Sequence, residues 1–181
     1  MNISKNIQWI TSVPEQWNLY RNRSYQVKLQ KADVSHIYHE GGEPGVVYNY
    51  LERSYEKVNE NGYVVTGLMQ EMWPIGPGAL KKYDIDPDAI TNEPQLVSTR
   101  ETDTVYAAIR IPEEIGFALE TDYGEKAWLK GNAQDVPHDG GDFVLVCARL
   151  ENGRYVPDFE DGGRIVNGHV FDKLYRLWDN S

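Results

Sequence analysis

The chain has 181 residues, enough for one ordinary domain or two small lobes, and its 40% of hydrophobic residues can supply a packed core. The formal net charge of -10, from 18 basic and 28 acidic residues, disfavours direct binding to nucleic acid or to an anionic membrane, since both need a positive surface. The one cysteine, Cys147, excludes an intramolecular disulfide, and no apolar run reaches the roughly 18 residues of a membrane-spanning helix. We therefore expect a cytoplasmic protein.

The first third of the chain begins with a polar leader, residues 1–24, whose scattered aromatic residues we expect to pack on the body of the protein or on a partner. Residues 25–31 alternate apolar and polar side chains, which predicts a half-buried strand. A Gly-rich loop follows at residues 41–45. Residues 46–58 fit either one face of a helix or a strand, and the sequence leaves both interpretations open.

The next elements complete a first lobe, residues 25–83. Residues 59–62 predict a turn that leads into a strand at 63–67. Two prolines and two glycines in residues 73–78 predict that any regular element stops there, and residues 79–83 resemble a single helical turn.

The remaining chain predicts a connector, residues 84–104, and a second lobe, residues 105–181. The connector holds two prolines, several acidic residues and few large apolar groups. The second lobe opens with a predicted strand at residues 105–111. Asn152-Gly153 stands between two further predicted strands and is a strong signal for a two-residue hairpin.

One short pattern occurs in both lobes and predicts an internal duplication. When Tyr63 is set on Phe143, the following apolar residues align, and Lys31 falls within one residue of Arg110. We therefore predict a strand-rich α+β fold of two similar small lobes, with antiparallel sheets and short helical turns. Similar half-domains often pack about a pseudo-twofold axis and leave a groove between them.

The repeated pattern resembles the small PGDYG-type proteins of bacteria and their phages. In the second lobe the resemblance rests on the turn Gly141-Asp142-Phe143 and on the closing pair Phe171 and Tyr175. The first lobe keeps Trp73-Pro74-Ile75 and Tyr83, but its turn Asn61-Gly62-Tyr63 lacks the aspartate. The resemblance implies a bacterial or mobile-element origin and implies no activity. The turn also has a purely structural explanation, because an Asp side chain can cap nearby backbone N–H groups.

Residues that could carry chemistry do not form a complete motif. His36 and His39 have a spacing that could place two imidazoles on one metal, with His138 and His169 as further ligands, but no complete metal motif is present. The carboxylates around Asp158 lack the ligand pattern of a calcium loop. We expect no metal, no cofactor and no catalytic residue.

The sequence therefore favours a non-catalytic protein that binds a small ligand or a protein partner. Its ligand would lie in a groove between the lobes, lined by aromatic residues of both, namely Tyr63, Trp73, Tyr83, Tyr155 and Tyr175. One alternative is an acidic inhibitor that mimics nucleic acid for a basic partner, which requires its acids to share one continuous face. A second alternative is a hydrolase, which requires at least two histidines and one carboxylate in a pocket.

Overall fold

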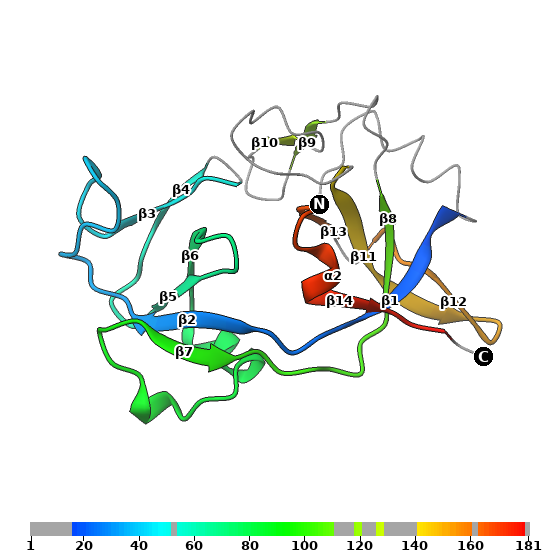
Figure 1. Cartoon of the computed structure of the whole chain (residues 1–181), viewed down its shortest axis with the longest axis horizontal. Coiled ribbons are helices and arrows are strands. Elements are labelled where there is room, and N and C mark those ends of the chain that lie inside the picture. The colour runs from blue at the N-terminus through cyan, green and yellow to red at the C-terminus, as the bar shows by residue number, and fades with distance from the viewer. Residues whose placement is uncertain are drawn as a thin grey trace. The chain divides into compact units, whose positions relative to one another are not determined.

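A computed structural model describes residues 16–51, 54–110, 118–120, 126–128, 141–160 and 163–179, and it shows a strand-rich α+β protein with antiparallel sheets and few short helices (Figure 1). The chain divides into two compact units. Unit 1 comprises Met1–Arg23 and Glu101–Ser181, and unit 2 comprises Ser24–Arg100. Within the described ranges, no helix has the length and apolar character needed to cross a membrane.

Unit 2 contains an antiparallel sheet of four strands within the described residues, in the order β6-β5-β2-β7. Its strands are β2 (Gln26–Lys31), β5 (Tyr63–Thr66), β6 (Met72–Ile75) and β7 (Gln95–Ser98). The strand predicted at residues 25–31 is confirmed, with Val27 and Leu29 buried and Gln26 and Lys28 exposed. The alternation fails at Gln30, which is buried and donates its side-chain N–H to the carbonyl of Asn92. One face of this sheet therefore supplies a core.

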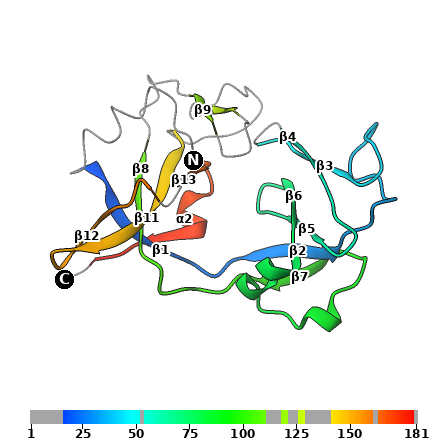
Figure 2. The same cartoon turned by 180° about the vertical axis from the view of Figure 1, so that it is seen from behind.

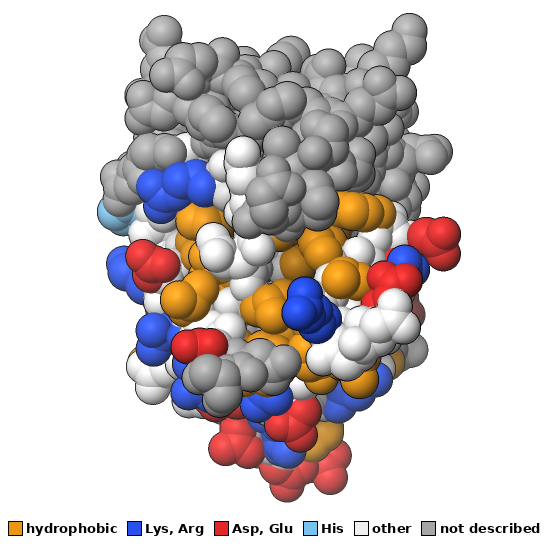
Figure 3. Space-filling model, turned by 90° about the vertical axis from the view of Figure 1, so that its right-hand side faces the viewer, with side chains coloured by type: hydrophobic (Ala, Val, Ile, Leu, Met, Phe, Trp, Pro, Cys, Tyr) orange, Lys and Arg blue, Asp and Glu red, His pale blue; other side chains and the backbone are white. Residues whose placement is uncertain are grey.

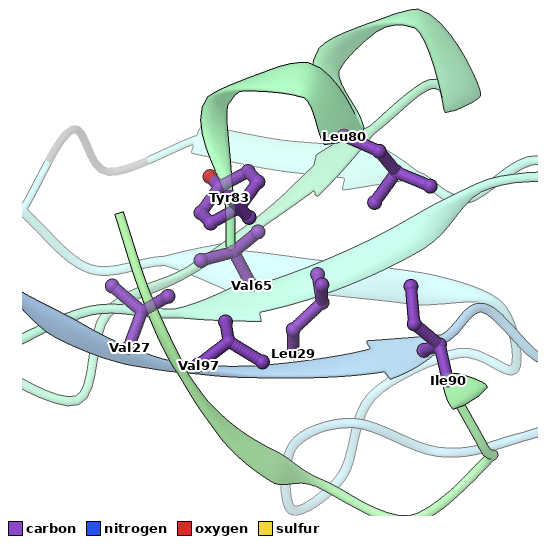
Figure 4. Close-up of a cluster of buried hydrophobic side chains, with 7 residues drawn as sticks. All are labelled: Val27, Leu29, Val65, Leu80, Tyr83, Ile90 and Val97. Carbon is purple, nitrogen blue, oxygen red and sulfur yellow. The ribbon is translucent and has the colours of Figure 1, made fainter. Parts of the chain in front are cut away.

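That core is closed by two short 3-10 helices, η2 (Pro77–Lys82) and η3 (Pro87–Ala89). The buried side chains meet over the sheet in Figure 4, where they are Val27, Leu29, Val65, Leu80, Tyr83, Ile90 and Val97. The helical turn predicted at residues 79–83 is confirmed by η2, which Tyr83 follows directly.

A separate hairpin in unit 2 joins β3 (Val46–Asn49) to β4 (Ser54–Lys57). The helical alternative for residues 46–58 is therefore wrong. Consecutive side chains point to opposite faces, as in a strand. Val47 is fully buried in a second cluster with Val58 and Val64, while its neighbour Tyr48 is directed to the opposite face of the hairpin.

Unit 1 contains a sheet with the order β12-β11-β8-β1-β14, in which β13 also pairs with β11. The strands are β1 (Asn18–Asn22), β8 (Tyr106–Arg110), β11 (Phe143–Glu151), β12 (Arg154–Pro157), β13 (Gly163–Val166) and β14 (Tyr175–Leu177). A further pair is formed by β9 (Ala118–Glu120) and β10 (Lys126–Trp128). Figure 2 shows the same elements from behind, with the short helix α2 (Phe171–Leu174) leading directly into β14.

The core of unit 1 is built around Phe171, which is 1% exposed. Its ring stacks on Phe143 with centroids 3.6 Å apart and lies near Tyr175 at 5.1 Å and Tyr20 at 4.9 Å. The buried members of this cluster are Ala108, Phe143, Leu145, Val166, Phe171 and Tyr175.

Three sequence-based boundaries differ from the structure. The predicted leader, residues 1–24, contains β1, and the predicted connector, residues 84–104, contains β7, because both strands are completed by backbone pairing with distant segments. Residues 73–78 were predicted to stop regular structure, yet Pro74 lies within β6. Proline is tolerated there because β6 is an edge strand, where a missing N–H costs no ladder bond.

The hairpin predicted at Asn152-Gly153 is confirmed. Both residues have positive φ, 50° and 78°, as the favoured two-residue turn requires. The flanking residues pair as expected, with Glu151 opposite Arg154.

Candidate functional site

A half-open hollow of about 590 Å³ lies on one face of the β3–β4 hairpin in unit 2. The neighbouring loop closes one side of it. The residues that line this hollow, which we call the hairpin pocket, are His39, Glu40, Gly41, Gly42, Glu43, Val46, Tyr48, Tyr55 and Lys57.

Three rings form the floor and wall of the hairpin pocket. Tyr48 and Tyr55 are directly opposite each other in the hairpin register, and their rings stack with centroids 4.6 Å apart. The imidazole of His39 lies 6.0 Å from the Tyr48 ring and 5.8 Å from the Tyr55 ring. Tyr55 remains 67% exposed, so one large aromatic surface is available to a ligand.

The alternation of the hairpin explains why these side chains share a face. Successive residues of a strand point to opposite sides, so Tyr48 shares its side with Val46. In the register Lys57 lies opposite Val46, so its side chain is on the same side of the hairpin as Tyr55. Val47 is buried on the other side and anchors the hairpin to unit 2.

The loop that precedes β3 is held by its own hydrogen bonds. The backbone N–H of Gly45 donates to the carbonyl of His36 over 2.8 Å, and the N–H of Asp33 donates to the hydroxyl of Tyr38 over 2.8 Å. Asp33 in turn accepts two hydrogen bonds from Ser35, and these lower the pKa of its carboxyl. Burial raises the pKa of the Tyr38 hydroxyl. The loop is therefore a defined support for the hairpin pocket.

The position of the His39 ring depends on packing against Gly42. A Cβ atom at Gly42 would lie 1.9 Å from both Cε1 and Nδ1 of His39, so only glycine permits this arrangement. Nδ1 of His39 is buried and has no hydrogen-bond partner among the described residues. Contact with Gly42, rather than a hydrogen bond at this nitrogen, therefore orients the ring toward the two tyrosines.

The five aromatic residues predicted to line an interlobe groove belong to different units. Tyr63, Trp73 and Tyr83 are in unit 2, whereas Tyr155 and Tyr175 are in unit 1. Tyr83 and Tyr175 are only 6% and 7% exposed and pack into the two cores. These two rings stabilise their units and offer almost no surface to a ligand.

The histidines do not converge in the described part of the chain. His39 lines the hairpin pocket, while the ring of His36 packs on Tyr38 at 4.7 Å. His169 is an exposed residue of unit 1, and His138 lies outside the described residues. Among the described residues, no group of three or more His, Cys, Asp or Glu side chains is arranged to hold a metal ion.

A second group of aromatic side chains, both partly exposed, lies on unit 1. The ring of Tyr155 meets that of Trp178 at 5.1 Å, and the guanidinium of Arg21 lies 4.9 Å from the centre of the Trp178 ring. Leu150, opposite Tyr155 in the hairpin, is 64% exposed. Figure 3 shows hydrophobic side chains gathered on this side of the molecule, with basic and acidic side chains among them.

The sequence predicts none of the residues of the hairpin pocket as a binding residue, and it indicates His39 as a possible metal ligand. The pair Tyr48 and Tyr55 is not apparent from the sequence because residues 46–58 also fit a helix. The sequence pattern that indicates this pair is one tyrosine on each side of the segment 49–54. In a hairpin centred on that segment, the two tyrosines lie opposite each other on neighbouring strands.

Comparison with known proteins gives no further guide to this site, since no family model, curated protein or solved structure matches the chain.

Proposed function

We propose that this is a non-catalytic binding protein whose ligand occupies the hairpin pocket. The observation that supports this most directly is the exposed ring of Tyr55, which is stacked on Tyr48 and held beside His39. Ligand sites typically combine aromatic surface with a few polar groups in a hollow, and the hairpin pocket has that composition. The proposal keeps the binding role expected from the sequence. It places the ligand in the hairpin pocket and not in a groove lined by Tyr83 and Tyr175, because these two tyrosines are core residues.

The polar groups of the pocket define the class of ligand. Glu40 and Glu43 supply carboxylate acceptors, and Lys57 supplies an ammonium donor. The two carboxylates and the net charge of -10 disfavour a phosphorylated ligand. A neutral ring with several hydroxyl groups fits best, because its apolar face can stack on Tyr55 while its hydroxyls bond to the charged groups. We therefore infer a sugar as the ligand class.

The two alternatives raised by the sequence have less support. The hydrolase requires two histidines in one pocket, and the hairpin pocket contains only His39 among the described residues. The acidic mimic requires a continuous acidic face, whereas basic side chains stand beside acidic ones in unit 1, as Arg21 does with Asp103 and Arg176 with Glu101. Some acids are also neutralised in ion pairs, such as Asp84 with Arg100 at 3.2 Å. A cytoplasmic location remains part of the proposal, since one cysteine gives no sign of an oxidising compartment.

The proposal can be tested by saturation-transfer NMR with a panel of neutral mono- and disaccharides. We expect transfer from the protein to the ring protons of at least one sugar, and loss of this transfer in Tyr55→Ala. Leu96→Ala is the matched control, because Leu96 lies on β7 of the same unit and is also 67% exposed. Transfer should survive in that variant.

Two results would contradict the proposal. One is the absence of transfer to any sugar of the panel at millimolar concentration. The other is transfer that survives Tyr55→Ala unchanged, which would place the sugar elsewhere on the protein.

A further inference from the structure

We propose that the two units derive from two copies of one repeat, residues 18–83 and 95–175, and that each copy gives its first strand to the sheet of the other. The inference rests on the pairing of the strands and on the hydrogen bonds at their ends. It goes beyond the binding function and is independent of it.

The central strands pair in the same register in both units. In unit 2 the last residue of β2, Lys31, lies opposite Tyr63, the first residue of β5. In unit 1 the last residue of β8, Arg110, likewise lies opposite Phe143, the first residue of β11. Tyr63 is therefore equivalent to Phe143, as in the alignment of the two lobes predicted from the sequence.

The third strands continue the equivalence. Tyr63 lies opposite Ile75 at the end of β6, and Phe143 lies opposite Val166 at the end of β13. Both units also have a pair of strands at the same place in the chain. In unit 2 the pair β3–β4 lies between β2 and β5, and in unit 1 the pair β9–β10 lies between β8 and β11. The order in the sheet, the direction and the register therefore agree over three strands, and β12 is an addition of unit 1 between β11 and β13 in the chain.

A short helix and a buried tyrosine follow in each unit. Tyr83 caps η2, and its N–H donates to the carbonyl of Leu80. Tyr175 caps α2, and its N–H donates to the carbonyl of Phe171. Both tyrosines then have extended backbones and pack into the core of their own unit.

The last strand of each sheet comes from the other copy. Four positions before Lys31, Val27 pairs with Val97 of β7. Four positions before Arg110, Tyr106 pairs with Tyr20 of β1. Strand β7 thus occupies in unit 2 the place that β1 occupies in unit 1.

The ends of these two strands make matching contacts with the capping tyrosines. Two positions after Val97, Thr99 lies opposite Tyr83. Two positions after Tyr20, Asn22 lies opposite Tyr175. The two strands therefore contact the core elements of their units at equivalent points.

The residue after Asn22 and the residue after Thr99 are both arginines, and each makes the same two hydrogen bonds. Arg23 donates its backbone N–H to Leu174 O over 2.7 Å and its Nε to Tyr175 O over 3.1 Å. Arg100 donates its backbone N–H to Lys82 O over 2.8 Å and its Nε to Tyr83 O over 3.0 Å. Such agreement in register, direction and side-chain bonding is the signature of a repeated unit.

Chain order shows that the first strands are exchanged. Strand β1 precedes β2 in the chain but pairs with β8, and β7 precedes β8 but pairs with β2. If β1 paired with β2 in the equivalent register, Asn22 would face Tyr25, and only Arg23 and Ser24 would remain for the turn. Such turns favour Gly, Asn or Asp at positive φ, and a short strained hinge favours strand exchange.

Engineered disulfides in the full chain distinguish the two pairings. In a Cys147→Ala background, one variant carries Lys28→Cys with Leu96→Cys, which lie directly opposite each other. The matched variant carries Lys28→Cys with Leu19→Cys. Leu19 is the residue of β1 equivalent to Leu96 and would face Lys28 only without exchange. Cross-strand neighbours have Cα separations that suit a disulfide.

We expect oxidation to crosslink the first variant and to leave the second with two free thiols, as read by thiol titration and by mass spectrometry of proteolytic peptides. Crosslinking of the Leu19 variant without crosslinking of the Leu96 variant would overturn the exchange. A crosslink of the first variant between two chains would show that the strand is exchanged between molecules in solution, and it would overturn the intrachain form proposed here.

A second measurement does not depend on thiol geometry. Residues 91–94 are exposed and join the two copies, so a protease site placed there cuts the full chain into two fragments. Because each fragment would supply one strand to the sheet of the other, we expect them to co-elute in native buffer and to separate only in denaturant. Separation in native buffer would contradict the exchange.

Discussion

The carboxylate of Asp142 accepts a hydrogen bond of 2.9 Å from the backbone N–H of Gly168, a residue 26 positions further along the chain. Asp142 is 3% exposed, and it directly precedes Phe143 at the start of β11. The sequence predicts that the Asp side chain of the Gly141-Asp142-Phe143 turn caps backbone N–H groups. The bond from Gly168 is of this kind, and it joins the start of β11 to the loop that leads into α2.

Replacement of Asp142 should therefore destabilise unit 1. In Asp142→Ala the N–H of Gly168 loses its acceptor, and we expect a loss of about 1–3 kcal/mol in the free energy of unfolding. Asp142→Asn keeps an acceptor oxygen of similar position and should lose less. Urea denaturation of both variants measures the difference, and equal losses would show that this bond does not carry the effect.

Local patterns predicted those elements whose conformation depends on neighbouring residues. Alternation gave β2, the pair Asn152-Gly153 gave the β11–β12 turn, and residues 79–83 gave the helical turn of η2. Each signal acts over a few residues, so the sequence contains it directly.

The pairings of β1 and β7 and the hairpin pocket could not be predicted in this way. Strand β7 lies in a segment with prolines and acids, and its pairing with β2 links residues about 70 positions apart, which no local pattern records. The pocket needs Tyr48 and Tyr55 in register and the His39 ring against Gly42, and both depend on tertiary contacts. The spacing of apolar residues in 46–58 also fits both a helix and a strand, so it does not predict the hairpin.

The Gly42→Ala substitution should change the shape of the hairpin pocket without unfolding unit 2. The new Cβ atom would lie 1.9 Å from two atoms of the His39 ring, so the ring must leave its position beside Tyr48 and Tyr55 or the loop must shift. We expect shifts of the His39 and Tyr55 ring signals in NMR spectra and weaker ligand binding.

Gly76→Ala is the control for this substitution, because a Cβ atom there meets nothing within 4 Å and its φ of -82° suits alanine. The ring signals of His39 and Tyr55 should be the same in that variant as in the native protein. If the two variants gave the same spectra, contact with Gly42 would not determine the ring position.

The Phe171→Ala substitution should destabilise unit 1 more than unit 2. Its ring is 1% exposed and contacts Phe143, Tyr175 and Tyr20, so its removal leaves a cavity that costs about 3–5 kcal/mol. Hydrogen exchange should then rise in β11 and β14 more than in β2 and β5, whose core is separate.

Leu177→Ala provides the matched control in unit 1, because Leu177 is 66% exposed and its truncation leaves no buried cavity. Exchange rates should remain close to those of the native protein. An equal rise in both units after Phe171→Ala would show that the two units unfold as one cooperative structure.

The buried hydroxyl of Tyr83 should make stability fall at alkaline pH. Burial raises the pKa of Tyr83 from 10.0 to about 12, and Figure 4 shows its ring among the apolar side chains of the unit 2 core. Between pH 10 and about pH 12, the Tyr83 hydroxyl loses its proton in the unfolded chain and keeps it in the folded protein. The stabilising contribution is therefore complete below pH 10 and is lost as the pH rises toward 12.

A difference of about two pKa units corresponds to about 3 kcal/mol, so this one group can account for a substantial part of an alkaline transition. Tyr83→Phe keeps the ring in the core and removes the titrating hydroxyl. Urea denaturation at a series of pH values should show the variant gaining stability relative to the native protein above pH 10, with a constant difference between the two at neutral pH. The other tyrosines are common to both proteins, so their titration cancels in the comparison. If the difference stayed constant through pH 12, ionisation of Tyr83 would not be linked to unfolding.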